Sequence, residues 1–247
     1  MRRIAALLVA LLAVLATPAF AQEVVTYEVV EVTVVGEAGV DAPAGSDRFV
    51  GAQPAIIPQG IAKFGPFRVL DATHAALVDA TDGRSPAAFA AMLAAYPGIA
   101  TLEMIECPGT LDDGANLKVG RMIRAKGLVT WVPKGGSVRS GGVELFLAGV
   151  KRIADPGSEF AVHAWEDEDG RQPGDFAADA PVNRVYLDYY REMGMSPVEA
   201  RAFYDMTNAV PNEDARWLNA AQMGQWVRLD KAPEFRLASL DSGQVLR

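Results

Sequence analysis

Residues 100–132, ATLEMIECPGTLDDGANLKVGRMIRAKGLVTWV, decide the fold of this chain. They begin with an apolar run, Ala100–Ile105, that has the length and composition of a buried strand. A turn follows, and apolar residues from Leu117 to Ile123 then recur at helical spacing until Gly127 ends the pattern. Leu128–Val132 is apolar again. Because a helix joins the two apolar runs, the segment predicts parallel strands with a right-handed crossover.

The same alternation extends in both directions along the chain. We expect strands at 67–70, 75–78 and just before His163, helices that begin at Ser85, Ser140, Pro181 and Pro197, a short helix at 220–225 and a strand near Val227. Residues 133–139 and 166–179 are rich in glycine, proline and charged residues and predict loops. Strands that alternate with helices of this length indicate an α/β fold with a mainly parallel sheet.

The N-terminus has the pattern of a secretory signal peptide. Arg2 and Arg3 precede the apolar run Ile4–Leu15, and a small-x-small cleavage site follows at Ala19–Ala21. The run is short for a membrane span, so an uncleaved anchor is the less favoured alternative. We therefore expect an exported protein, periplasmic or secreted, whose mature chain starts at Gln22.

The remainder of the chain divides by composition. Val24–Val35 alternates valine with polar residues, as an exposed strand does, and a linker rich in glycine, alanine and proline follows it. The expected divisions are a signal peptide at 1–21, a strand arm and linker at 22–46, one folded domain at 47–230 and a C-terminal tail at 231–247.

Charge and cysteine content exclude several kinds of site. The 247 residues carry a formal net charge of −8 without a Lys/Arg cluster, so the chain lacks the electrostatic footprint of nucleic-acid binding. The single cysteine, Cys107, excludes an internal disulfide and is expected to be a small buried residue rather than a reactive thiol. No metal-ligand spacing and no phosphate-binding loop occurs, and no later stretch is apolar enough to span a bilayer, so no metal, cofactor or membrane span is expected.

Ser140 is the candidate nucleophile. It stands at the start of an apolar helix, and two glycines follow it without side-chain bulk. The free N–H groups of a first helical turn favour negative charge. A serine nucleophile needs a base, and the two histidines of the chain are His74 and His163, of which His163 follows an apolar strand. The alternative is that Ser140 is an ordinary helix cap.

The turn Pro108-Gly109-Thr110 is a second candidate element of a site. It lies between a buried strand and the following helix, where open α/β sheets build their sites. Its backbone N–H groups are candidates for stabilising an oxyanion. An ordinary strand-to-helix turn is the alternative.

Five segments, in order, resemble the Clp protease proteolytic subunit and its relatives of the ClpP/crotonase fold. They are the turn IECPGTLDD at 105–113, the helix SGGVELFLAG at 140–149, the turn KRIADPG at 151–157, the strand FAVH at 160–163 and the segment WLNAAQM at 217–223. The resemblance spans Phe67 to Leu229 and is closest to secreted ClpP-like proteins. It implies a spiral of strand–helix units with a mainly parallel sheet.

The resemblance also implies catalytic residues in the order Ser, His, Asp. Ser140 takes the position of the nucleophile and His163 that of the base. The acid falls on Asp214 when a one-residue slip is allowed, with Glu213 and Asp205 as alternates. The implied oxyanion donors are the N–H groups of Gly109, Thr110 and Gly141.

Three features depart from the family pattern. Thr110 replaces the second glycine of the oxyanion turn, and a side chain there narrows the approach or changes the backbone angles. Gly141 replaces the bulky residue that follows the serine. The arm 24–35 stands where the family has axial loops. Ser137, in the loop before Ser140, is the fallback nucleophile.

We therefore expect an exported, ATP-independent serine hydrolase, most simply a peptidase that acts on peptides or unfolded segments. ATP is absent outside the cytoplasm, so an ATP-driven unfoldase is not an expected partner. The family implies homo-oligomers, as trimers or multiples of them. The alternative is a non-catalytic protein of the same fold that binds peptides or assembles an envelope complex.

Overall fold

The computed structural model describes residues 54–231. The predicted signal peptide at 1–21, the arm and linker at 22–46 and the tail beyond Lys231 lie outside this range. Within the range, no helix combines the length and apolar character needed to cross a membrane.

Two sheets form the framework. The larger contains, in spatial order, β1 (Ala62–Phe64), β2 (Phe67–Val69), β3 (His74–Leu77), β4 (Thr101–Met104), β6 (Val129–Val132) and β8 (Lys151–Ala154). The smaller contains β10 (Arg216–Asn219), β9 (Glu159–Val162), β7 (Ser137–Arg139) and β5 (Glu106–Cys107). Pairing is parallel from β3 through β4 and β6 to β8 and from β5 through β7 to β9. The β1–β2, β2–β3 and β9–β10 pairs are antiparallel. The predicted α/β fold with mainly parallel sheets is confirmed.

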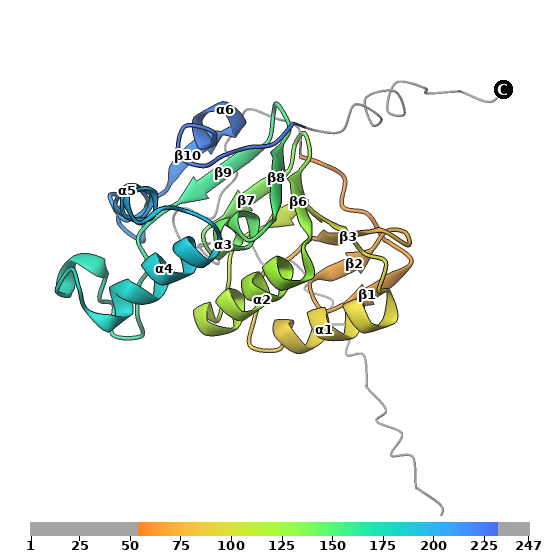
Figure 1. Cartoon of the computed structure of the whole chain (residues 1–247), viewed down its shortest axis with the longest axis horizontal. Helices are drawn as coiled ribbons and strands as arrows, with labels where there is room; N and C mark the ends of the chain where they lie inside the picture. Colours follow the sequence, from red (N-terminus) through yellow and green to blue (C-terminus); the bar gives the residue numbers. More distant parts are fainter. Residues whose placement is uncertain (1–53, 232–247) are drawn as a thin grey trace, which may run out of the picture. The chain divides into compact units, whose positions relative to one another are not determined.

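Helices cover the strands. They are α1 (Ser85–Ala95), α2 (Asp113–Lys126), α3 (Gly141–Leu147), α4 (Pro181–Glu192), α5 (Pro197–Thr207) and α6 (Ala220–Met223), with a 3₁₀ turn at Pro173–Asp175. Helices α1 and α2 lie side by side, α2 packs against α3, and α4 packs against α5 (Figure 1).

Local sequence explains the central strand–helix–strand unit. Asp112 caps α2, because its carboxylate accepts a hydrogen bond from the N–H of Ala115 at 2.9 Å. Gly127 ends the helix with φ +73°, a left-handed conformation that glycine adopts without strain. Strand β6 then pairs in parallel with β4, as the pattern predicted.

Ile105 is the point where the chain passes from one sheet to the other. Strand β4 pairs within the larger sheet, whereas β5 pairs with β7 in the smaller one. Strand β5 thus lies just beyond the run predicted as a strand, where the sequence indicated the start of a turn. This crossing carries the turn Pro108–Thr110 to the smaller sheet, where β7 and β9 end.

Several short strands escaped prediction. Strands β1, β5, β7, β8 and β10 were not expected, and β7 occupies the end of the predicted loop 133–139. The predicted strand near Val227 is wrong, because that stretch is turn and irregular backbone. Strand β7 is hard to recognise because two of its three buried residues are polar, Ser137 and Arg139, and these bond to partners on other strands.

Candidate active site

Ser140 has a strained backbone. Its φ of +46° and ψ of −129° make it the one residue other than glycine with positive φ in the described range. Such conformations cost about 1–3 kcal/mol and persist where the surrounding structure holds them. Ser140 occupies the N-cap position of α3, but its side chain makes no capping hydrogen bond. Helix capping therefore does not account for the serine, whereas a strained strand-to-helix turn is a geometry that presents a nucleophile.

Gly109 lies against Ser140. A Cβ atom built on Gly109 would lie 3.1 Å from the Cβ of Ser140 and 3.5 Å from its Oγ, and Gly109 has φ +135°. A side chain at this position would be strained and would crowd Ser140. The sequence-predicted oxyanion turn is thus next to the predicted nucleophile.

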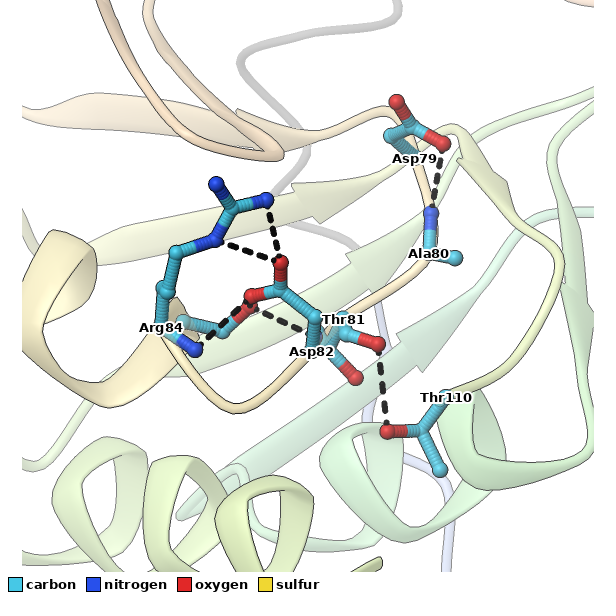
Figure 2. A network of polar contacts seen from close by, with 7 residues as sticks. Asp79, Ala80, Thr81, Asp82, Arg84 and Thr110 are labelled. Carbon is cyan, nitrogen blue, oxygen red and sulfur yellow. Dashed lines mark hydrogen bonds and ion pairs between the residues drawn. The ribbon is translucent and has the colours of Figure 1, made fainter. Parts of the chain in front are cut away.

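The loop before α1 supports the Gly109 turn from behind. Thr81 donates its N–H to the carbonyl of Gly109 at 3.1 Å and accepts from the N–H of Leu111 at 2.8 Å. The hydroxyl of Thr110 donates to the carbonyl of Thr81 at 3.3 Å (Figure 2). Within residues 54–231, the N–H groups of Gly109 and Thr110 have no acceptor of their own. They are available to a ligand.

Asp82 fixes this supporting loop to the start of α1. Its carboxylate accepts hydrogen bonds from the backbone N–H, Nε and Nη2 of Arg84 at 2.8–3.0 Å (Figure 2). It also accepts from the hydroxyl of Ser85 at 3.1 Å. These bonds hold the pKa of the Asp82 carboxyl below its usual value, with the Arg84 side chain as the largest cause.

Thr110 and Gly141, two departures from the family pattern, fit each other. A Cβ atom on Gly141 would lie 2.6 Å from Cγ2 of Thr110 and 3.0 Å from its Cβ. The threonine methyl therefore fills the space that a side chain at position 141 would need. The Thr110 hydroxyl turns away, and its single proton is shared between the carbonyls of Asp112 at 3.0 Å and Thr81 at 3.3 Å. Gly141 begins α3, so its N–H has no acceptor within the helix.

Asn116 connects the supporting loop with the start of α3. This buried side chain accepts from the hydroxyl of Thr81 at 2.8 Å and donates to the carbonyl of Gly141 at 2.7 Å. It was not predicted from the sequence, because an asparagine within an amphipathic helix gives no local signal. It fixes the distance between the two groups of predicted oxyanion donors.

His163 lies one residue beyond the end of β9, as Ser140 lies one residue beyond β7. The two strands pair in parallel, with Arg139 opposite Ala161, and Ser140 donates its N–H to the carbonyl of Ala161 at 2.9 Å. The ends of adjacent parallel strands thus bring the predicted nucleophile and base to the same edge of the smaller sheet.

The imidazole of His163 is held through Nδ1. This nitrogen lies 2.8 Å from the carbonyl of Ala164 and 3.1 Å from Nδ2 of Asn212, which itself donates to that carbonyl at 2.8 Å. A carbonyl oxygen only accepts, so the hydrogen-bonded tautomer has its proton on Nδ1. This leaves the lone pair of Nε2 free to take a proton, as a general base requires.

None of the predicted acids contacts His163 in the described structure. Asp214 is exposed, Glu213 lies near Gln172, and Asp205 pairs with Arg201 along α5 at 3.6 Å. Asn212, two residues before Asp214, stands beside Nδ1 instead. The sequence search missed it because it sought a carboxylate, and because the contact depends on Val210, whose carbonyl accepts the N–H of Ala164 at 2.8 Å.

A cavity of about 50 Å³ opens beside Ser140 and His163. Besides these two, its lining includes residues of α2, α3, α4 and α5: Asp113, Asn116, Leu117, Gly141, Val143, Glu144, Tyr186, Tyr190, Tyr204 and Thr207, with Val162, Trp165 and Asn208. The predicted nucleophile and the predicted base therefore both line this cavity. No group of three or more His, Cys, Asp or Glu side chains that could hold a metal occurs in the described part of the chain.

Glu144 is a buried acid in the wall of this cavity. Burial raises the pKa of its carboxyl from 4.5 to about 7, although the hydroxyl of Tyr190, which donates to Oε1 at 2.8 Å, acts in the opposite direction. Near neutral pH the folded protein therefore holds this carboxyl partly protonated, whereas the unfolded chain ionises it.

The raised pKa of Glu144 predicts a pH-dependent stability. Between pH 4.5 and about 7 the folded state binds more protons than the unfolded state, so the free energy of unfolding falls as pH rises. The full shift corresponds to about 3 kcal/mol. Relative to Glu144→Gln, the wild type should lose up to this amount between pH 5 and 8, measured by chemical denaturation. Glu192→Gln, on the exposed side of α4, is the control, and parallel curves for wild type and Glu144→Gln would contradict the prediction.

The remaining candidates lie elsewhere. Ser137, the fallback nucleophile, is fully buried in β7 and donates to Glu159 at 2.8 Å while it accepts from Arg139 at 2.8 Å. His74 begins β3 and its Nδ1 lies 2.9 Å from the carboxylate of Asp71. Neither residue lines the cavity. Cys107 is buried, and burial raises the pKa of its thiol.

No protein-family model matches the sequence, and a comparison with curated proteins found no match. Similar solved structures include the 1510-N membrane-bound stomatin-specific protease. One mutant, in complex with a substrate peptide, has a TM-score of 0.43 and 12% identity over 65% of this chain and 75% of that chain. A second mutant has a TM-score of 0.45 and 13% identity over 65% and 78%. A ClpP1 mutant from Listeria monocytogenes has a TM-score of 0.47 and 16% identity over 67% and 94%.

Proposed function

We propose that this protein is an exported serine hydrolase that cleaves peptides without ATP, with Ser140 as the nucleophile and His163 as the general base. The observation that carries the proposal is the strained backbone of Ser140 at a cavity that His163 also lines. Strain of this kind is stored at functional sites, and a simple helix cap would not need it.

The geometry supports acyl transfer in two steps. Nε2 of His163 accepts the proton of Ser140 Oγ as the oxygen attacks the substrate carbonyl carbon. The N–H groups of Gly141 and of Gly109 or Thr110 stabilise the resulting oxyanion, each worth roughly 3 kcal/mol. The imidazolium then protonates the leaving amine, and water hydrolyses the acyl-enzyme by the same route.

Asn212 takes the orienting role in this proposal. It lies beside Nδ1 and donates to the same carbonyl of Ala164 that receives the Nδ1 proton. It thereby holds acceptor and ring together, and a Ser-His-Asn arrangement of this type needs no carboxylate. The assignment of the acid to Asp214 remains a prediction of the family resemblance alone.

A non-catalytic, peptide-binding protein of the same fold is the second candidate. Two observations favour it: no carboxylate bonds to His163 within residues 54–231, and Oγ of Ser140 makes no hydrogen bond to the imidazole there. We propose for both candidates that the protein is exported and that it forms a homo-oligomer, trimeric or larger. They rest on the sequence pattern at 1–21 and on the resemblance.

Covalent labelling distinguishes the two candidates. A fluorophosphonate probe should label the folded wild type and should fail to label Ser140→Ala, because the probe reacts with an activated serine hydroxyl. Ser137→Ala is the matched control and should remain labelled. Labelling is read by in-gel fluorescence and intact mass. Labelling that survives in Ser140→Ala would exclude the assigned nucleophile, and an unlabelled wild type would favour the binding protein.

A further inference from the structure

The cavity beside Ser140 is acidic. Two carboxylates, those of Asp113 and Glu144, belong to its lining, and no lysine or arginine does. Arg121 of α2 is paired with Glu192 at 2.6 Å and lies over the ring of Tyr189. No lysine or arginine of the lining neutralises the charge of Asp113 or of the ionised form of Glu144, which favours a cationic occupant.

Glu144 keeps accepting capacity for that occupant. Its Oε1 accepts from Tyr190, and no other side chain within residues 54–231 donates to the carboxylate. An ionised carboxylate offers about four acceptor positions. Glu144 is 9% exposed, so a charged partner inside the cavity would meet it away from bulk water. Charge-assisted hydrogen bonds are the strongest that such a site can make.

Aromatic rings complete the wall. Trp165 stacks on Tyr186 with ring centroids 6.2 Å apart and an interplanar angle of 8°, and Tyr186 lies 6.3 Å from Tyr204. Their hydroxyl and indole groups are engaged, because Tyr186 donates to Asp113 at 2.9 Å and Trp165 to Tyr204 at 2.9 Å. Aromatic rings suit methylene groups and attract an ammonium group through the π-face.

The size of the cavity limits the occupant. A volume of about 50 Å³ corresponds to roughly four water molecules at about 10–15 Å³ each. This volume accommodates an unbranched side chain of four or five heavy atoms rather than an aromatic ring. An unbranched chain that ends in an ammonium group is the side chain of lysine.

We propose that this cavity is the specificity pocket of the hydrolase and that it takes the lysine side chain next to the bond that is cut, with Glu144 as the acceptor of the ammonium group. The inference rests on the proposed function, because the cavity is a specificity pocket only if Ser140 is the nucleophile of a hydrolase. Asp113, at the exposed rim, contributes long-range attraction.

Peptides that differ only at the residue before the cleaved bond test this proposal. With lysine, norleucine or glutamate at that position, kcat/KM should be about 100-fold higher for lysine than for norleucine, as a desolvated charge pair implies, and lowest for glutamate. Glu144→Gln retains an acceptor for Tyr190, and in it the lysine-to-norleucine ratio should fall at least tenfold. Glu192→Gln should keep the wild-type ratio. Cleavage with norleucine equal to or better than lysine would overturn the proposal while leaving the hydrolase intact.

A binding measurement separates the pocket from the chemistry. In Ser140→Ala, n-butylammonium should shift the indole N–H resonance of Trp165, and Glu144→Gln in that background should abolish the shift. The uncharged isostere 1-butanol should bind more weakly. Binding of butanol at least as tight as that of butylammonium would overturn the cation pocket. Butylammonium binding without probe labelling or cleavage of any peptide would support the pocket and contradict the hydrolase.

Discussion

Replacing His163 by alanine is expected to lower kcat/KM for peptide hydrolysis by about 10³–10⁴-fold, the range typical of removing the base of a serine hydrolase. Without the imidazole, Ser140 Oγ loses the proposed acceptor of its proton, because His163 is the one histidine among the residues that line the cavity. Fluorophosphonate labelling should slow in parallel. The measurement is initial rates on a fluorogenic peptide, with circular dichroism to confirm that the variant is folded.

The same assay decides which residue orients the imidazole. Asn212→Ala should lower kcat about tenfold and leave KM nearly unchanged, because Asn212 acts through the position of His163. It should also shift the pH–rate profile, which a merely structural role would not do. Asp214→Asn, at an exposed position, should stay within about twofold of the wild type. The reverse order of effects would restore Asp214 as the acid of a Ser-His-Asp triad.

The sequence predicted those parts of the fold whose causes are local. The apolar runs at 100–105 and 128–132 and the terminating Gly127 are visible without a structure. Strand β7 is different, because Arg139 is buried only by virtue of Glu106 on β5, 2.6 Å from its Nη2. A polar strand stabilised by a distant partner gives no period-two pattern, so it was predicted as a loop.

In the candidate site, too, the features that depend on residues distant in the sequence could not be predicted. Ser140 and His163 follow strands and could be selected from their positions and from the resemblance. The positive φ of Ser140 is imposed by the junction of β7 and α3 and has no signature in the residues themselves. Asn212 depends on a turn near Val210 that docks against Ala164. Glu144 appears in sequence as one acid in an apolar helix, and its position in a cavity wall follows only from the packing of α4.

Replacing Gly141 by alanine is expected to lower kcat/KM by about 10³-fold, because it displaces donors on both sides of the oxyanion, and loss of one donor already costs about 10²–10³-fold. The new Cβ would lie 2.6 Å from Cγ2 of Thr110 and 3.1 Å from Nδ2 of Asn116. Either the Gly109 turn or the start of α3 must then move. A harmful effect of Gly141→Ala would point to these contacts, because Gly→Ala inside a helix without such contacts stabilises the helix by up to about 1 kcal/mol.

A second substitution tests whether Thr110 is the cause. Thr110→Ser removes the methyl group that Gly141→Ala would meet and retains the hydroxyl that donates to Asp112 at 3.0 Å. The double variant should therefore regain at least tenfold in kcat/KM over Gly141→Ala, while Thr110→Ser alone should stay near the wild type. Coupling of this size in a double-mutant cycle would show that the two departures from the family pattern compensate each other. A double variant as inactive as Gly141→Ala would mean that the N-terminus of α3, rather than its contact with the Gly109 turn, sets the oxyanion geometry.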